Sequence, residues 1–127
     1  MGVRRRIAAD AGTAAVRAWL DAPPESRTGL PRPVLATAVR YALEELSEAA
    51  EGNSVEVRVP PFGVAQCVEG PRHTRGTPPN VVEMDAQTWL GLATGVLPWA
   101  EARAAGSVGA SGLRADLSAH LPLFGPV

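Results

Sequence analysis

The sequence predicts an α+β fold, with a small, mostly antiparallel sheet and helices packed on one side of it. Two observations predict this class: strand-like segments lie in the middle of the chain, and helical patterns lie at both ends. The first two strand-like segments, residues 55–59 and 62–69, follow each other closely enough to pair antiparallel. A chain of 127 residues, of which 46% are hydrophobic, is the size of one domain and can bury a single core.

Two helices are predicted before the sheet. Residues 11–21 form the first helix, with Asp10 as its N-cap. Residues 33–51 form the second, because apolar residues recur at helical spacing and Pro33 suits a first helical turn. Residues 23–32 between them are rich in Pro, Ser, Thr and Gly, which predicts a loop or linker.

Four strands are predicted from short segments that follow the second helix. Residues 55–59 alternate between valine and charged residues, as a half-buried strand does. Residues 62–69 and 81–84 are mostly apolar, and residues 107–112 alternate among small residues. Residues 70–80 are rich in Gly, Pro and Arg, so no regular structure is expected there.

Three short helices complete the prediction. Asp85 caps the first of them, which runs to residue 94 and ends at Gly95. The second is expected over residues 98–105. The third is expected over residues 115–121, where Pro122 closes it.

Composition excludes several classes of protein. The net charge of −1 gives no general attraction to nucleic acid, and no apolar run is long enough to span a bilayer. The basic N-terminus is not followed by the apolar region of a signal peptide, and Cys67 is the one cysteine, so we expect a cytoplasmic protein without disulfides. All 12 basic residues are arginine, which hints at a bacterium with a GC-rich genome.

The second half of the chain carries a recognisable order of segments. Residues 85–95 predict a capped helix that ends in glycine, and residues 97–102 (LPWAEA) predict a short helix. Residues 106–112 (GSVGASG) predict a strand bounded by glycines, and a Leu-rich helix follows. This order resembles the sterol carrier protein domain. Residues 60–67 and 70–80 are similar to the actinobacterial members of that family.

The resemblance implies a division of the chain and a role for it. Residues 1–32 would be an N-terminal helix with a Pro-rich linker, and residues 33–127 a sterol carrier-like domain. Such domains hold an apolar ligand between the sheet and the helices. The chain is therefore expected to be a lipid-binding carrier module, with no cofactor, for a fatty-acyl or sterol-like ligand that can have an acidic head group.

The bulky residues nearest the family's cavity are the candidates for an apolar ligand site. An acyl chain or sterol needs a concave apolar lining with few polar groups. The alternative for each of these residues is plain core packing. The candidates are Phe62, Trp89, Leu92, Trp99, Leu117, Leu121 and Phe124.

A basic loop is the candidate site for an acidic head group. Arg72, His73, Arg75 and Asn80 lie close together in sequence, and arginine suits carboxylate or phosphate groups. The alternatives are an ion pair within the protein, or a solvated loop. Arg4, Arg5 and Arg6 are expected to form a solvated terminus, with weak contact to an anionic membrane as the alternative.

The remaining reactive residues favour neither a metal site nor an enzyme. His73 and His120 are the two histidines and lie far apart in sequence, without metal-ligand spacing. Cys67 lies in an apolar strand and is expected to be a buried small hydrophobe, and a Cys67–His73 nucleophile pair is a weak alternative. Asp85 already has a capping role, so Glu83 and Asp85 do not suggest an acid–base pair.

Two functions from different classes remain. The first is the lipid carrier, whose partner would be a lipid or other apolar small molecule, with no nucleic acid and no stable membrane insertion. The alternative is a non-catalytic interaction or dimerisation domain with a filled core. In that case the chain would form a homodimer, or dock on a partner, through the N-terminal helix and Trp19.

Overall fold

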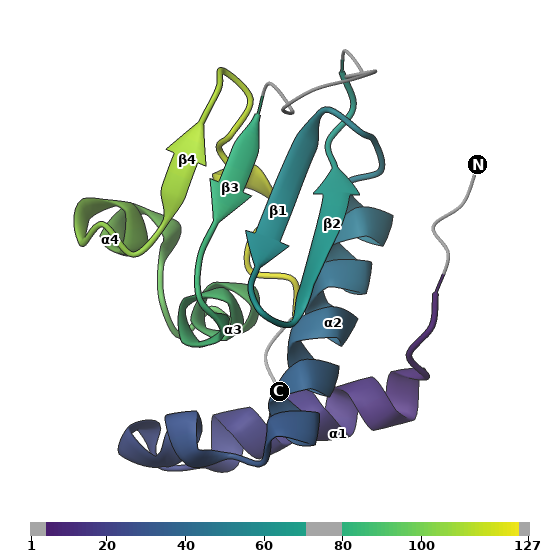
Figure 1. The fold of residues 1–127 in the computed structure, drawn as a ribbon, viewed down its shortest axis with the longest axis vertical. Coiled ribbons are helices and arrows are strands. Elements are labelled where there is room, and N and C mark those ends of the chain that lie inside the picture. The colour runs from purple at the N-terminus through teal and green to yellow at the C-terminus, as the bar shows by residue number, and fades with distance from the viewer. Residues whose placement is uncertain (1–4, 71–79, 125–127) are drawn as a thin grey trace.

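The computed structural model describes residues 5–70 and 80–124, which form one four-stranded sheet with its helices (Figure 1). The α-helices are α1 (Ala9–Asp21), α2 (Arg32–Ala49), α3 (Ala86–Thr94) and α4 (Trp99–Ala104). The strands are β1 (Val55–Val59), β2 (Gly63–Cys67), β3 (Val81–Glu83) and β4 (Gly109–Ser111). Two short 3₁₀ helices are η1 (Pro24–Gly29) and η2 (Ser118–His120).

The sheet confirms the predicted α+β class. Its strand order is β2-β1-β3-β4. β1 pairs with β2 and β3 with β4 in antiparallel register, whereas β1 and β3 are parallel. Val57 lies opposite Ala65 on β2 and Val82 on β3, so the centre of the sheet is built from small and β-branched side chains.

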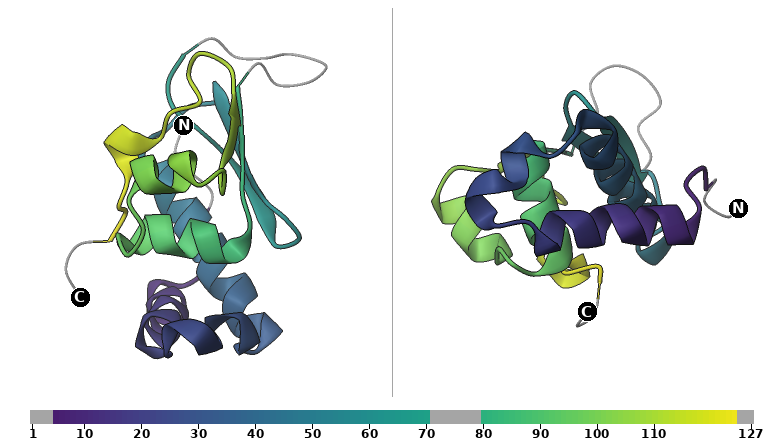
Figure 2. Two further views of the ribbon diagram at one scale, coloured as in Figure 1. Left: turned by 90° about the vertical axis from the view of Figure 1, so that its left-hand side faces the viewer. Right: turned by 90° about the horizontal axis from the view of Figure 1, so that it is seen from below.

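The helices pack on one side of the sheet, as predicted (Figure 2, left). The valines of β1 face the helices and are buried, whereas Glu56 and Arg58 between them pair with each other on the opposite face. Val64 of β2 is on that outer face and is 58% exposed. The sheet therefore has one buried and one solvated face, which explains the alternation in its sequence.

Helix α1 runs across α2 below the sheet and belongs to the same hydrophobic core (Figure 1). The contact depends on Gly12, where an added Cβ would lie 2.2 Å from the ring carbons Cγ and Cδ1 of Tyr41. Trp19 is buried against the rest of the molecule, its Nε1 donates to Gln87 Oε1 at 2.9 Å, and Arg27 stacks on its ring. A separate unit at residues 1–32 stays a prediction, but Trp19 offers no surface for docking.

Two side chains of α2 cap the edge of the sheet. β2 is an edge strand, and the backbone groups of alternate residues point away from β1. Arg40 Nε donates to the carbonyl oxygen of Phe62 at 2.7 Å, and Ser47 Oγ donates to that of Gln66 at 2.9 Å. The helix thus satisfies edge carbonyls that a neighbouring strand would otherwise take.

The caps of α3 confirm the sequence prediction for this helix. Asp85 Oδ1 accepts a hydrogen bond from the backbone N–H of Thr88 at 2.8 Å. Gly95 follows the helix with φ of 86°, a left-handed conformation that favours glycine. Asp85 and Gly95 thus fix where α3 begins and ends along the chain.

Three local predictions were wrong: the N-cap of α1, the linker that follows it, and the helix over residues 115–121. Helix α1 begins at Ala9, so Asp10 lies in its first turn and accepts from the adjacent N–H of Ala11 instead of capping the helix. The predicted linker contains the 3₁₀ helix η1, which starts at Pro24 because proline suits a first helical turn.

The predicted helix over residues 115–121 is a single 3₁₀ turn, η2. Asp116 Oδ1 accepts from the N–H of Ser118 at 2.8 Å, which starts a short turn. Hydrogen bonds to Ser118 lower the pKa of Asp116, so the carboxylate form favours this turn. Pro122 then leaves too few residues for a longer helix.

Candidate functional site

Three of the predicted apolar site residues are fully buried in the hydrophobic core. Trp89, Leu92 and Leu117 have 0–1% of their surface exposed, and Trp89 Nε1 donates to the carbonyl oxygen of Val39 at 3.2 Å. These three residues therefore line no cleft that opens to solvent. All three belong to the hydrophobic core, and their contact with a ligand stays a prediction that requires the interior to open.

The other four predicted apolar residues are only partly buried and lie at separate places around the core. Phe124 stacks on Tyr41 of α2, with 6.0 Å between the ring centroids. Trp99 begins α4, and Leu121 follows η2. Phe62 lies between β1 and β2, and it alone of these four lines the groove described next.

A groove of about 650 Å³ lies between α2 and the edge strand β2. Its apolar lining comes from Ile7, Leu43, Phe62, Val64 and Ala65. Its other lining residues are Arg6, Thr37, Arg40, Glu44, Ser47 and Gly63. The groove is therefore amphipathic, with apolar and polar surfaces side by side.

Arginines outnumber unpaired acids along this groove. Arg6 and Arg40 line it, and Arg32 stacks over the ring of Phe62 at 5.1 Å. Glu44 is the acid in the lining, and it pairs with Arg5 at 3.2 Å. An anionic group at this surface would meet the guanidinium groups of Arg6 and Arg40. Glu44 would repel it little, because Arg5 already neutralises that carboxylate.

A second, shallower groove of about 370 Å³ lies between α1 and α2. It is lined by Ala11, Ala14, Ala15, Ala18, Pro33, Val34 and Thr37. Thr37 lines both grooves, so they border each other at this residue.

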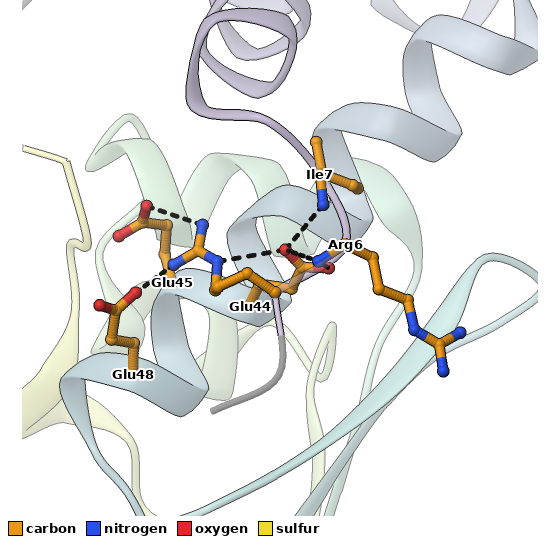
Figure 3. Close-up of polar contacts among 6 residues, drawn as sticks. Arg6, Ile7, Glu44, Glu45 and Glu48 are labelled. Atoms are coloured by element: carbon orange, nitrogen blue, oxygen red, sulfur yellow. Dashed lines mark hydrogen bonds and ion pairs between the residues drawn. The ribbon is translucent and has the colours of Figure 1, made fainter. Parts of the chain in front are cut away.

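Arg5 differs from the solvated terminus that the sequence predicts, whereas Arg6 is exposed and Arg4 lies outside the described residues. Arg5 forms ion pairs with Glu44, Glu45 and Glu48 of α2, and the side chain of Arg6 points away from this cluster (Figure 3). The signal in the sequence was the run of three glutamates within one and a half turns of a helix. Such a cluster needs a cation nearby to offset its repulsion.

The predicted head-group residues fall into two groups. Arg72, His73 and Arg75 lie outside the described residues. Asn80 is buried: its Nδ2 donates to the carbonyl oxygen of Ser54 at 2.7 Å, and its Oδ1 accepts from the N–H of Arg114 at 2.9 Å. Both ends of the Asn80 amide thus hold backbone together, and binding of an anion by this loop stays a prediction.

Sequence reasoning missed most of the groove. Its residues come from three separate segments, and those on α2 recur at positions 37, 40, 43, 44 and 47 along one face of the helix. Pairing Gly63 and Ala65 with Val59 and Val57 leaves small residues at the edge of the sheet, next to α2. The signal available in the sequence was a strand with small residues beside a helix with a polar face. This signal can be recognised only when the pairing register of β1 and β2 is known.

Cys67 is fully buried at the end of β2, and burial raises the pKa of its thiol to about 12. Because only the thiolate reacts, we expect Cys67 of the folded protein to resist 5,5′-dithiobis(2-nitrobenzoate) at pH 8. The same reagent should react with one thiol per chain in 6 M guanidinium chloride. Rapid labelling of the folded protein, measured at 412 nm, would show that β2 opens without global unfolding.

Within residues 5–70 and 80–124, no three His, Cys, Asp or Glu side chains gather as a metal site would require. Over the same residues, no helix combines the length and apolar character of a membrane span.

The chain is thus a small α+β domain with an amphipathic groove beside its sheet. Residues 31–123 match a protein family described as the bacterial SCP ortholog, where SCP stands for sterol carrier protein. The chain belongs to this bacterial sterol carrier protein-like family, which confirms the resemblance in the sequence. The family suggests a lipid-carrier role, and its carriers are generally non-catalytic. No curated protein matches the chain.

Proposed function

We propose that the protein is a lipid-binding carrier that holds a fatty-acyl or sterol-like ligand in the groove between α2 and β2. The observation that carries this proposal is the groove itself, about 650 Å³ in volume. Sites for small molecules are commonly clefts of roughly 300–1,000 Å³. The family match supports a carrier role, and the groove supplies a place for its ligand.

The two kinds of lining fit the two ends of an amphiphile. Burying each CH₂ of an acyl chain against Ile7, Leu43 and Phe62 contributes roughly 0.8 kcal/mol, without any specific hydrogen bond. Arg6 and Arg40 can meet a carboxylate or phosphate head group. The loop with Arg72, His73 and Arg75 is a further candidate for that head group. A cytoplasmic protein of an actinobacterium that moves lipid between partners fits this picture.

The test fills the groove at the residue that both grooves share. Thr37→Trp should lower the affinity for 11-(dansylamino)undecanoic acid at least tenfold, because the indole occupies space that the acyl chain needs. Dansyl emission during a titration of the delipidated protein measures the affinity. Thr13→Trp is the matched control, since it makes the same substitution on the exposed side of α1.

Wild type and Thr13→Trp should bind the probe equally. Equal affinity of Thr37→Trp and wild type would place the ligand elsewhere, and no binding by the wild type would reject the carrier function.

A filled interior favours a second candidate, a non-catalytic interaction domain. The largest side chains between the sheet and α3, including Trp89 and Leu90, leave no surface accessible to water. On this alternative the wild type binds no dansyl probe, and light scattering gives the mass of a dimer. A monomer that binds the probe would favour the carrier.

A further inference from the structure

Residues 5–8 form a short segment, here called the strap, that lies across α2 before α1 begins at Ala9. Arg5 binds the carboxylates of Glu44, Glu45 and Glu48 and stacks over Tyr41, 5.3 Å from the ring centroid. The side chain of Arg5 alone thus anchors the strap to four residues of α2.

Backbone groups of the strap also bind α2. The N–H groups of Arg6 and Ile7 both donate to the carboxylate of Glu44, at 3.1 and 3.2 Å (Figure 3). Glu44 therefore accepts hydrogen bonds from three consecutive residues of the strap. It is the most buried of the three glutamates, with 16% of its side chain exposed.

The strap and α2 depend on each other electrostatically. Glu44 and Glu48 lie four residues apart on one helix face, where like charges repel. The positive charge of Arg5 offsets this repulsion. Burial alone would lower the pKa of Arg5, but the hydrogen bonds and negative charges of Glu45 and Glu48 raise it by more. Arg5 therefore stays charged, and the attachment holds unless salt or a substitution weakens it.

The strap is also a wall of the groove between α2 and β2. Arg6 and Ile7 line it from one side, and Leu43 and Val64 line it from α2 and β2. Glu44 belongs to both features, since it lines the groove and holds the strap. Release of Glu44 would free Arg6 and Ile7, which form this wall of the groove.

From this geometry we infer that the strap is a latch, held closed by Arg5, whose opening widens the groove between α2 and β2. The gating role rests on the proposed function, because it presumes that a ligand uses the groove. The latch itself does not, because its opening can be measured without ligand.

Hydrogen exchange measures the latch directly. In Arg5→Ala, the amide protons of Arg6 and Ile7 should exchange at least tenfold faster than in wild type, by NMR. Arg17→Ala is the matched control, an exposed arginine on α1, and should leave both rates unchanged. The Val57 amide in β1 should exchange at the wild-type rate in both variants, which shows that the fold is intact. Raising NaCl from 0.05 to 0.5 M should speed exchange at Arg6 and Ile7 in wild type.

Stopped-flow binding of 11-(dansylamino)undecanoic acid measures the gating. The association rate constant of Arg5→Ala should exceed that of wild type at least threefold, and Arg17→Ala should match wild type. Unchanged exchange at Arg6 and Ile7 in Arg5→Ala would reject the latch. Faster exchange with an unchanged association rate would reject its gating of the groove. Failure of the wild type to bind the probe would reject the proposed function, while the exchange data would still decide the latch.

Discussion

Replacing Trp89 with alanine is expected to lower the free energy of unfolding by about 3–5 kcal/mol. The Trp89 side chain extends from α3 and is fully buried, and its removal leaves a cavity that its neighbours can fill only in part. It also leaves the carbonyl oxygen of Val39 without the indole N–H that binds it at 3.2 Å. Urea denaturation followed by circular dichroism at 222 nm measures the loss.

Trp99→Ala is the matched control, since it makes the same change at a half-buried tryptophan of α4. Its loss of stability should be clearly smaller, because less apolar surface is removed from the core. A stable Trp89→Ala variant that has lost probe binding would contradict this expectation. That result would mean that Trp89 lines a ligand site, as the family resemblance implied.

Gly12→Ala is expected to destabilise the protein by about 1–3 kcal/mol, although alanine favours helices. The new methyl group would overlap the ring of Tyr41, 2.2 Å from its nearest carbons, so α1 must move away from α2. Trp19 lies on α1 and is buried, so a red shift of tryptophan emission should accompany the change. Urea denaturation gives the size of the effect.

Gly29→Ala is the control for this substitution. A Cβ at Gly29 would meet no atom within 4 Å, so its stability should stay close to wild type. Equal stability of Gly12→Ala and Gly29→Ala would show that α1 and α2 do not pack through Gly12 and Tyr41.

Local patterns predicted most of the fold because the signals lie within single elements. Asp85 and Gly95 mark the ends of α3 in the sequence, and both do so in the structure. The alternation of β1 likewise gave its buried and solvated faces. The error at residues 115–121 has a local cause as well, since the Asp116 side chain competes for the backbone at a place where only a short turn fits.

The candidate site was harder to predict because it depends on contacts between distant segments. Arg5 and Glu44 are 39 residues apart, and nothing near Arg5 in the sequence indicates its partners. Bulky residues such as Trp89 and Leu117 are compatible with both a cavity wall and a packed core. Only the way in which they fit together decides between the two, and periodicity does not report it.

The hydrogen bonds from Arg40 and Ser47 to β2 have a consequence for the behaviour of the protein at high concentration. A β-sheet can recruit identical molecules strand by strand, and such growth leads to aggregates. At β2, an incoming strand would first have to displace both side chains from the carbonyl oxygens of Phe62 and Gln66. The opposite edge, β4, is three residues long and gives little room for propagation. Helix α2 thus protects the protein from polymerising through its longer edge strand.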